Sequence, residues 1–162
     1  LPNLISNYTS FNEWANKRIV DWLSTLDESV LYAPVQSSYP SLDYTVQHIL
    51  RGQKFWLLFI TGQSTAGFSW AVREGEARNI LQELNENSSR MKEAFSSFSE
   101  AELLEILHLD MPWAKNDRCR YDYIQHIINH SSFHRGQLVT IARTLGVTEN
   151  IPNTDYNIFN TF

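Results

Sequence analysis

Cysteine is nearly absent from the sequence, with one residue among 162. This excludes an internal disulfide framework and a zinc site built from cysteines. Long apolar runs are missing too: the longest uncharged apolar stretch covers residues 55–60, whereas a membrane-spanning helix needs about 20 residues. Cations are scarce, with 13 Lys and Arg against 18 Asp and Glu and a formal net charge of -5, although binding a phosphate backbone requires clustered cations. We therefore expect neither a nucleic acid nor a membrane as a partner. We also expect the protein to be cytoplasmic.

Glycine and proline are sparse, at six and five residues, and no repeat or linker divides the chain. Hydrophobic residues make up 43%, enough for a single domain over residues 1–162 with its own core. Apolar residues recur at the spacing of one helix face in four long stretches: residues 3–25, 42–61, 76–98 and 121–145. The sequence thus predicts an all-α fold, a four-helix bundle with a long excursion between the third and fourth helices.

The excursion covers residues 106–120. Pro112 cannot lie inside a helix, because proline lacks a backbone N–H and clashes with the preceding turn, so we expect some extended pairing around it. Just before the excursion, Ser99 and Glu102 form a capping box, which predicts the start of a short helix. Ser41 is likewise placed to cap the second long helix.

Histidines recur every four residues on the predicted fourth helix, at His126, His130 and His134. Residues four apart lie on the same side of a helix, about 6 Å apart along its axis, so two such imidazoles can bind one metal ion. Two ligands hold a metal weakly, and His48 on the predicted second helix is placed to supply a third. We predict a triad of His48, His130 and His134, which leaves a position open for water or substrate, as in catalytic metal sites.

Spacing alone leaves two alternatives to this triad. His126 is also four residues from His130 and is an alternative member of the pair. Histidines at this spacing also occur as solvated or hydrogen-bonded pairs, and a single histidine such as His48 is often a hydrogen-bonded core residue.

Several stretches of the sequence together resemble a known family. The most specific is residues 126–138, in which two histidines four apart are followed at once by Arg-Gly-Gln and an aliphatic residue. Residues 12–18 resemble the first-helix pattern of that family, His48 with Phe55-Trp56 resembles its second-helix metal segment, and residues 146–156 resemble its usual ending. The chain is similar to the DinB-like (DNA-damage-inducible) superfamily.

The resemblance implies a four-helix bundle that holds a divalent metal ion, nickel or zinc, with three histidines. Carried over residue by residue, the ligands are His48, His130 and His134, whereas His126 matches a position that is commonly histidine without being a ligand. The resemblance also implies frequent dimers. Some relatives use low-molecular-weight thiols in metal-dependent transfer reactions, and many others have no assigned activity.

We therefore expect a divalent-metal-dependent enzyme, a thiol S-transferase or a hydrolase, that acts on a small molecule through the three-histidine site. A low-molecular-weight thiol is the expected co-substrate and a homodimer the expected assembly. The main alternative is a non-catalytic, metal-binding dimeric bundle with a stress or sensor role, and a metal-free interaction domain is the third hypothesis.

Catalytic side chains are less evident than metal ligands. Tyr44 lies one turn before His48, so its hydroxyl is a candidate to reach the site, although a core tyrosine is the simpler interpretation. Asn12 is a second candidate to line the same cavity. Gln137 and Asn129 are candidates to hold the outer N–H groups of the imidazoles, which metal sites generally require; backbone carbonyls would serve equally well.

Arg135 and Gly136, which directly follow the last histidine, also suggest specific environments. Arg135 has two alternative environments, an ion pair with Asp155 or Asp21 and plain solvation. Gly136 costs a helix about 1 kcal/mol relative to Ala, which suggests the close approach of a neighbouring helix or chain. We interpret the aromatic residues around the end of the second helix as core or dimer interface rather than a cofactor site: Trp56, Phe59, Phe68 and Trp70.

Overall fold

The computed structural model describes residues 1–159, which form six α-helices, a two-stranded sheet and a short 3-10 helix. The fold is mostly helical, as predicted, but the excursion contains an antiparallel β-hairpin, so the expectation of an all-α fold does not hold there. None of the helices in this part of the chain has the length and apolarity that crossing a membrane requires. In chain order the elements are α1 Pro2–Leu23, α2 Glu28–Tyr32, α3 Leu42–Ile60, α4 Ala77–Ser96, α5 Glu100–Leu104, β1 Ile106–Met111, β2 Ala114–Cys119, α6 Arg120–Thr144 and the 3-10 helix η1 Tyr156–Ile158.

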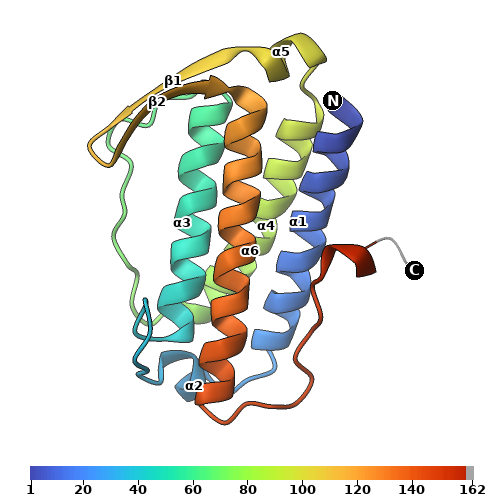
Figure 1. Ribbon diagram of the computed structural model, residues 1–162. Helices are drawn as coiled ribbons and strands as arrows, with labels where there is room; N and C mark the ends of the chain where they lie inside the picture. The colour runs from blue at the N-terminus through green and yellow to red at the C-terminus, as the bar shows by residue number, and fades with distance from the viewer. Residues whose placement is uncertain (160–162) are drawn as a thin grey trace.

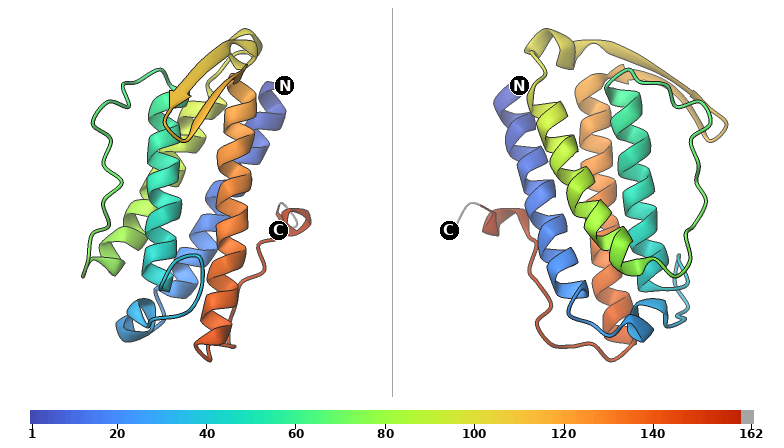
Figure 2. Two further views of the ribbon diagram at one scale, coloured as in Figure 1. Left: turned by 60° about the vertical axis from the view of Figure 1, so that its left-hand side comes forward. Right: turned by 180° about the vertical axis from the view of Figure 1, so that it is seen from behind.

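The four long helices α1, α3, α4 and α6 lie side by side, with short elements at both ends, and η1 lies alongside α1 (Figure 1). α1 packs mainly against α4, and α3 packs mainly against α6. The hairpin and α5 lie at one end of the helices and α2 at the other, as the two further views confirm (Figure 2). The two helices predicted to carry the histidine ligands are therefore neighbours.

Helix boundaries follow the capping residues that the sequence contains. Ser41 precedes α3, and its Oγ accepts a hydrogen bond from the backbone N of Tyr44 at 3.2 Å. Ser99 and Glu102 form the predicted capping box at the start of α5. Gly146 follows α6 with a φ of 85°, a conformation that glycine adopts without steric cost.

Two apolar clusters fill the space between the helices, one towards α2 and one towards the hairpin. Between them, each long helix contributes one buried residue to what we call the polar layer: Asn16, Gln53, Ser88 and Ser131. Asn16 Nδ2 donates to Ser88 Oγ at 2.9 Å, Ser88 Oγ lies 3.3 Å from Gln53 Oε1, and Gln53 Nε2 donates to Ser131 Oγ at 3.0 Å. Because buried polar groups are costly unless paired, this layer favours one alignment of the four helices along their axes.

The hairpin gives the predicted extended pairing a regular form. β1 and β2 pair along their whole length, and Trp113 lies in the two-residue turn between them. Lys115 reaches Asp110 on the facing strand at 2.7 Å, and opposite charges on facing residues favour such pairing. His108 is exposed on β1 and lies 2.9 Å from Asp117, away from any cluster of histidines.

Candidate metal centre

The three histidines predicted as metal ligands come together between α3 and α6. Nε2 of His48 lies 3.0 Å from Nε2 of His130, which lies 3.2 Å from Nε2 of His134. The ligand atoms of the three side chains all lie within 4.8 Å of one another. Within residues 1–159, no other group of three or more His, Cys, Asp or Glu side chains converges in this way. The four-residue repeat on α6 and the packing of α3 against it produce this cluster.

The two shorter separations between the imidazole nitrogens are compatible with a shared cation. Two nitrogens at about 2.0–2.1 Å from one ion are about 2.9 Å apart at a right angle and about 3.4 Å apart at a tetrahedral angle; both observed distances lie between these limits. A neutral imidazole carries only one N–H. Nδ1 of His134 faces Oε1 of Gln137 at 2.7 Å, so the proton of a neutral His134 ring belongs on Nδ1, and Nε2 presents a lone pair to the cluster.

Gln137 determines which nitrogen of His134 faces the cluster. Nδ1 of His134 lies 2.7 Å from Oε1 of Gln137, whose amide nitrogen donates to Ser38 Oγ at 3.2 Å. The carbonyl oxygen therefore accepts from Nδ1–H, and Nε2 presents its lone pair to the other imidazoles. Metal-binding histidines usually make such an outer hydrogen bond. Asn129, the other candidate for this role, instead accepts a hydrogen bond from the Tyr8 hydroxyl at 2.5 Å.

Gly52 of α3 leaves room for the ring of His130. A Cβ at this position would lie 3.2 Å from Cε1 and 3.5 Å from Nδ1 of His130, so a side chain here would press on the imidazole. Nδ1 of His130 is buried and has no hydrogen-bond partner among the described residues. Packing, rather than an outer hydrogen bond, therefore holds this ring.

Burial keeps the three imidazoles neutral. Burial, the proximity of His134 and the cation Arg51 lower the pKa of His48 to about 4, and burial together with the neighbouring histidines lowers the pKa of His130 to about 3. Burial also lowers the pKa of His134, although the hydrogen bond to Gln137 opposes that shift. At neutral pH the three side chains are therefore in the form that binds metals.

Tyr39 lies against the cluster, although helix spacing does not single it out. Its ring stacks on His48, with centroids 4.4 Å apart and an interplanar angle of 26°, and meets His134 edge-on at 5.8 Å. Tyr44, the candidate named from the sequence, makes no side-chain hydrogen bond to these histidines within residues 1–159. Tyr39 precedes α3 in a loop, where no helical period indicates the direction of a side chain.

His126 lies outside the cluster. Its ring centroid is 6.0 Å from that of His130, whereas 4.4 Å separates the rings of His130 and His134. His126 instead meets the ring of Trp56 at 4.9 Å. Of the two pairs that the spacing allows, the structure therefore favours His130 with His134.

Arg135 follows the cluster on α6 and is almost fully buried, at 2% exposure. Its guanidinium donates to Oδ1 of Asn12 at 3.0 Å and to Oδ1 of Asn16 at 2.7 Å. Both expected environments, an ion pair with Asp155 or Asp21 and plain solvation, are therefore wrong. Asn12, the second catalytic candidate, is thus engaged by Arg135. Burial lowers the pKa of Arg135 to about 10, so it remains a cation at neutral pH.

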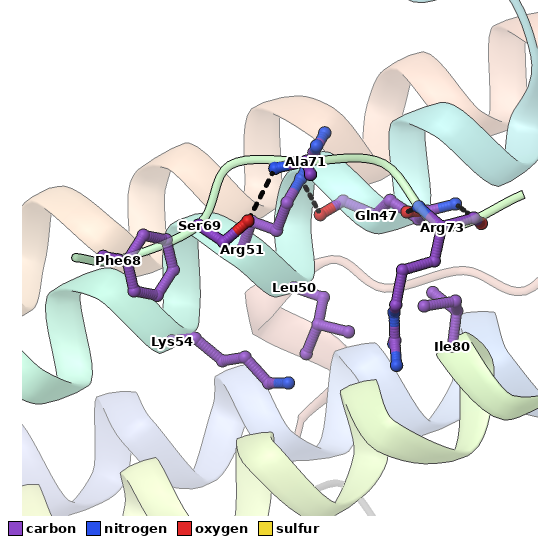
Figure 3. Close-up of a pocket in the computed structure, with 9 residues that line it drawn as sticks. All are labelled: Gln47, Leu50, Arg51, Lys54, Phe68, Ser69, Ala71, Arg73 and Ile80. Atoms are coloured by element: carbon purple, nitrogen blue, oxygen red, sulfur yellow. Dashed lines mark hydrogen bonds between the residues drawn. The ribbon is translucent and has the colours of Figure 1, made fainter.

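The connection between α3 and α4 is tied to α3 by two side chains of that helix, Gln47 and Arg51 (Figure 3). Nε2 of Gln47 donates to the carbonyl of Arg73 at 2.8 Å, and Oε1 of Gln47 accepts from the backbone N of Arg73 at 2.9 Å. Arg51 donates to the carbonyl oxygen of Trp70. These contacts hold Trp70 in the wall of a cavity that His48 also lines.

Comparisons with known proteins agree with this architecture. A family model described as the DinB family matches residues 2–161. Protein DinB of Bacillus subtilis (strain 168) is 21% identical over 155 residues, which cover 92% of this chain and 89% of that protein. A crystal structure of a DinB-like protein from Bacillus cereus ATCC 10987 matches with a TM-score of 0.66 and 19% identity, over 86% of this chain and 89% of that one. At this identity the structural likeness supports the fold alone.

Proposed function

The chain belongs to the DinB family, and from this premise we propose that it is a divalent-metal-dependent enzyme whose ion, nickel or zinc, is held by His48, His130 and His134. The convergence of three neutral imidazoles supports the proposal. Three protein ligands leave at least one coordination position open, as in catalytic metal sites. We class the four long helices as a four-helix bundle, in which sites formed by facing helices are common.

When bound, a divalent cation supplies Lewis acidity, which lowers the pKa of a thiol or water that coordinates it. Three neutral imidazoles add no negative charge, so the centre favours an anionic nucleophile. No carboxylate of the described residues joins the cluster to act as a general base. The nucleophile must therefore ionise readily, and a thiol, with a pKa of about 8.5, does so far more easily than water. We propose that the sulfur of a low-molecular-weight thiol attacks an electrophilic group of the second substrate. The bond to sulfur forms as the bond to the leaving group breaks, and the leaving group departs with the electron pair while the thiol proton passes to it or to water. Hydrolysis, with water as the nucleophile, is the second reaction.

A non-catalytic metal-binding role, as in a stress or sensor protein, is the second candidate function. It is favoured by the same lack of a carboxylate base, because metal binding alone needs no proton acceptor. In either role we propose a homodimer. Leu4, Phe133 and Tyr156 expose 62%, 65% and 44% of their surface, and a second copy would cover these apolar side chains.

The test compares metal-loaded protein with chelator-treated protein and with two variants. His134→Ala removes a ligand and should abolish both stoichiometric metal binding and thiol transfer, screened with several thiols and a model electrophile. His108→Ala removes an exposed histidine on β1 and should change neither. Full metal occupancy without turnover would favour the non-catalytic role, and equal metal retention in both variants would contradict the site.

A further inference from the structure

We propose that a cavity beside the three histidines binds an uncharged aromatic group of the substrate between three tryptophans. This inference rests on the proposed function, because it names the substrate class of the same site. The cavity has a volume of about 450 Å³, within the usual range for small-molecule sites. His48 and His130 line part of it, so a ligand held there lies next to the candidate metal centre.

Three tryptophans line the cavity from three different elements: Trp56 lies on α3, Trp70 in the connection to α4, and Trp113 in the hairpin turn. All three surround the buried ring of Phe55, with centroids 5.4, 5.3 and 5.7 Å from it, respectively. Segments that are distant in the sequence therefore build one aromatic surface beside the histidines.

Two of these tryptophans are unusually exposed for such large apolar side chains. Trp70 exposes 42% and Trp113 exposes 53% of its surface, whereas Trp56 exposes 6%. Large apolar side chains gathered around a concave site mark a binding surface. Core packing therefore explains Trp56, but it does not explain why Trp70 and Trp113 stay at the surface beside the cavity.

The lining of the cavity selects against charged ligands. None of its lining residues in the described chain is Asp, Glu, Lys or Arg. A cation would find favourable indole faces but no Asp or Glu in the lining to pair with. An anion would lie against the negative faces of the indoles with no Lys or Arg in the lining beside it. An uncharged ring can stack on them without the cost of dehydrating a charge.

The aromatic walls are held in place before a ligand arrives. Trp56 stacks on Tyr123 at 5.4 Å with an interplanar angle of 24°, and the ring of Trp113 meets Trp56 edge-on at 6.0 Å. Arg51 fixes the backbone of Trp70. Walls that are already ordered reduce the entropy lost on binding.

The test titrates 2-naphthalenemethanol, an uncharged bicyclic aromatic, into metal-free and nickel-loaded protein by isothermal titration calorimetry. Cyclohexylmethanol, naphthalene-2-sulfonate and benzyltrimethylammonium are the aliphatic, anionic and cationic comparisons. We expect the naphthalene compound to bind both protein forms about tenfold more tightly than any comparison, the scale that aromatic stacking supplies. Trp113→Ala should remove about that factor and Trp113→Phe should restore most of it, while Trp14→Ala, which changes a tryptophan outside the cavity, should leave the affinity unchanged.

Equal affinity in the wild type and Trp113→Ala, or tighter binding of a charged or aliphatic comparison, would overturn the inference. Melting temperatures show that each variant is folded, and Trp70→Ala replaces Trp113→Ala if that variant does not fold. Metal content, measured on the same samples, separates the two proposals. Metal uptake without binding of the naphthalene compound overturns the cavity inference alone, whereas binding of that compound without metal uptake overturns the metal-dependent function.

Discussion

Two helical glycines offer a matched pair of substitutions near the candidate metal centre, Gly52→Ala in α3 and Gly136→Ala in α6. At Gly52 the added Cβ would lie 3.2 Å from Cε1 of His130. At Gly136 it would meet no atom within 4 Å among the described residues, apart from its chain neighbours and the adjacent backbone of its own helix. The close helix contact that the sequence suggests for Gly136 is therefore not found within residues 1–159, and this position serves as the control.

Helix propensity favours both substitutions. Ala is more favourable than Gly in a helix interior by about 1 kcal/mol, which corresponds to about 2–4 °C in Tm for a chain of this size. Gly136→Ala should raise the Tm by that amount. Gly52→Ala should raise it less, because the ring of His130 must shift by a few tenths of an ångström to admit the methyl group in a closely packed interior. The displaced imidazole should lower metal affinity about tenfold, the lower end of what lost support of a ligand costs.

Thermal unfolding of the metal-free variants measures the change in Tm, and competition with a fluorescent chelator measures the change in metal affinity. We expect Gly136→Ala to bind metal as the wild type does and Gly52→Ala to bind it more weakly. A Gly52→Ala protein with wild-type metal affinity and the full increase in Tm would refute the role assigned to the contact with His130. Weaker metal binding by Gly136→Ala would show that the effect does not come from that contact.

Two further substitutions test the surroundings of the cluster. Gln137→Ala removes the acceptor for Nδ1–H of His134 and should lower metal affinity about 10–100-fold, measured by the same competition; an unchanged affinity would show that Gln137 does not orient the ligand. Arg135→Lys keeps the charge but loses the planar fork that reaches Asn12 and Asn16, so it should lower the free energy of unfolding by about 2 kcal/mol. A urea midpoint equal to that of the wild type would contradict this assignment.

Periodicity is sufficient to predict the four long helices and the convergence of His130 with His134, because both depend on local helical geometry. It also places His48 on another of the four helices, whereas the packing of that helix against α6 depends on the tertiary fold. It cannot identify Tyr39, which lies in a loop whose path depends on tertiary packing. The regular hairpin is difficult to predict for a different reason: the turn around Trp113 lacks the Asn-Gly or Asp-Gly pair that marks most two-residue turns.

The buried polar groups show where sequence reasoning reaches its limit. A charged side chain such as Arg135 suggests an ion pair or exposure to solvent, yet its partners Asn12 and Asn16 come from another helix and are neutral. The aromatic cavity is similar in this respect, since Trp70 and Trp113 line it from the connection and from the hairpin turn, two segments that are distant in the sequence. The partners of Arg135 and the aromatic cavity both depend on contacts between distant segments, which residue spacing within one helix does not predict.

The proposed function requires that three imidazoles from two helices bind one ion. Anomalous scattering from crystals grown with zinc, measured at the zinc absorption edge, locates such an ion. We expect one strong peak at about 2.0–2.1 Å from Nε2 of His48, His130 and His134. A peak at His126 or His108 instead, or no peak beside the three rings, would contradict the assignment.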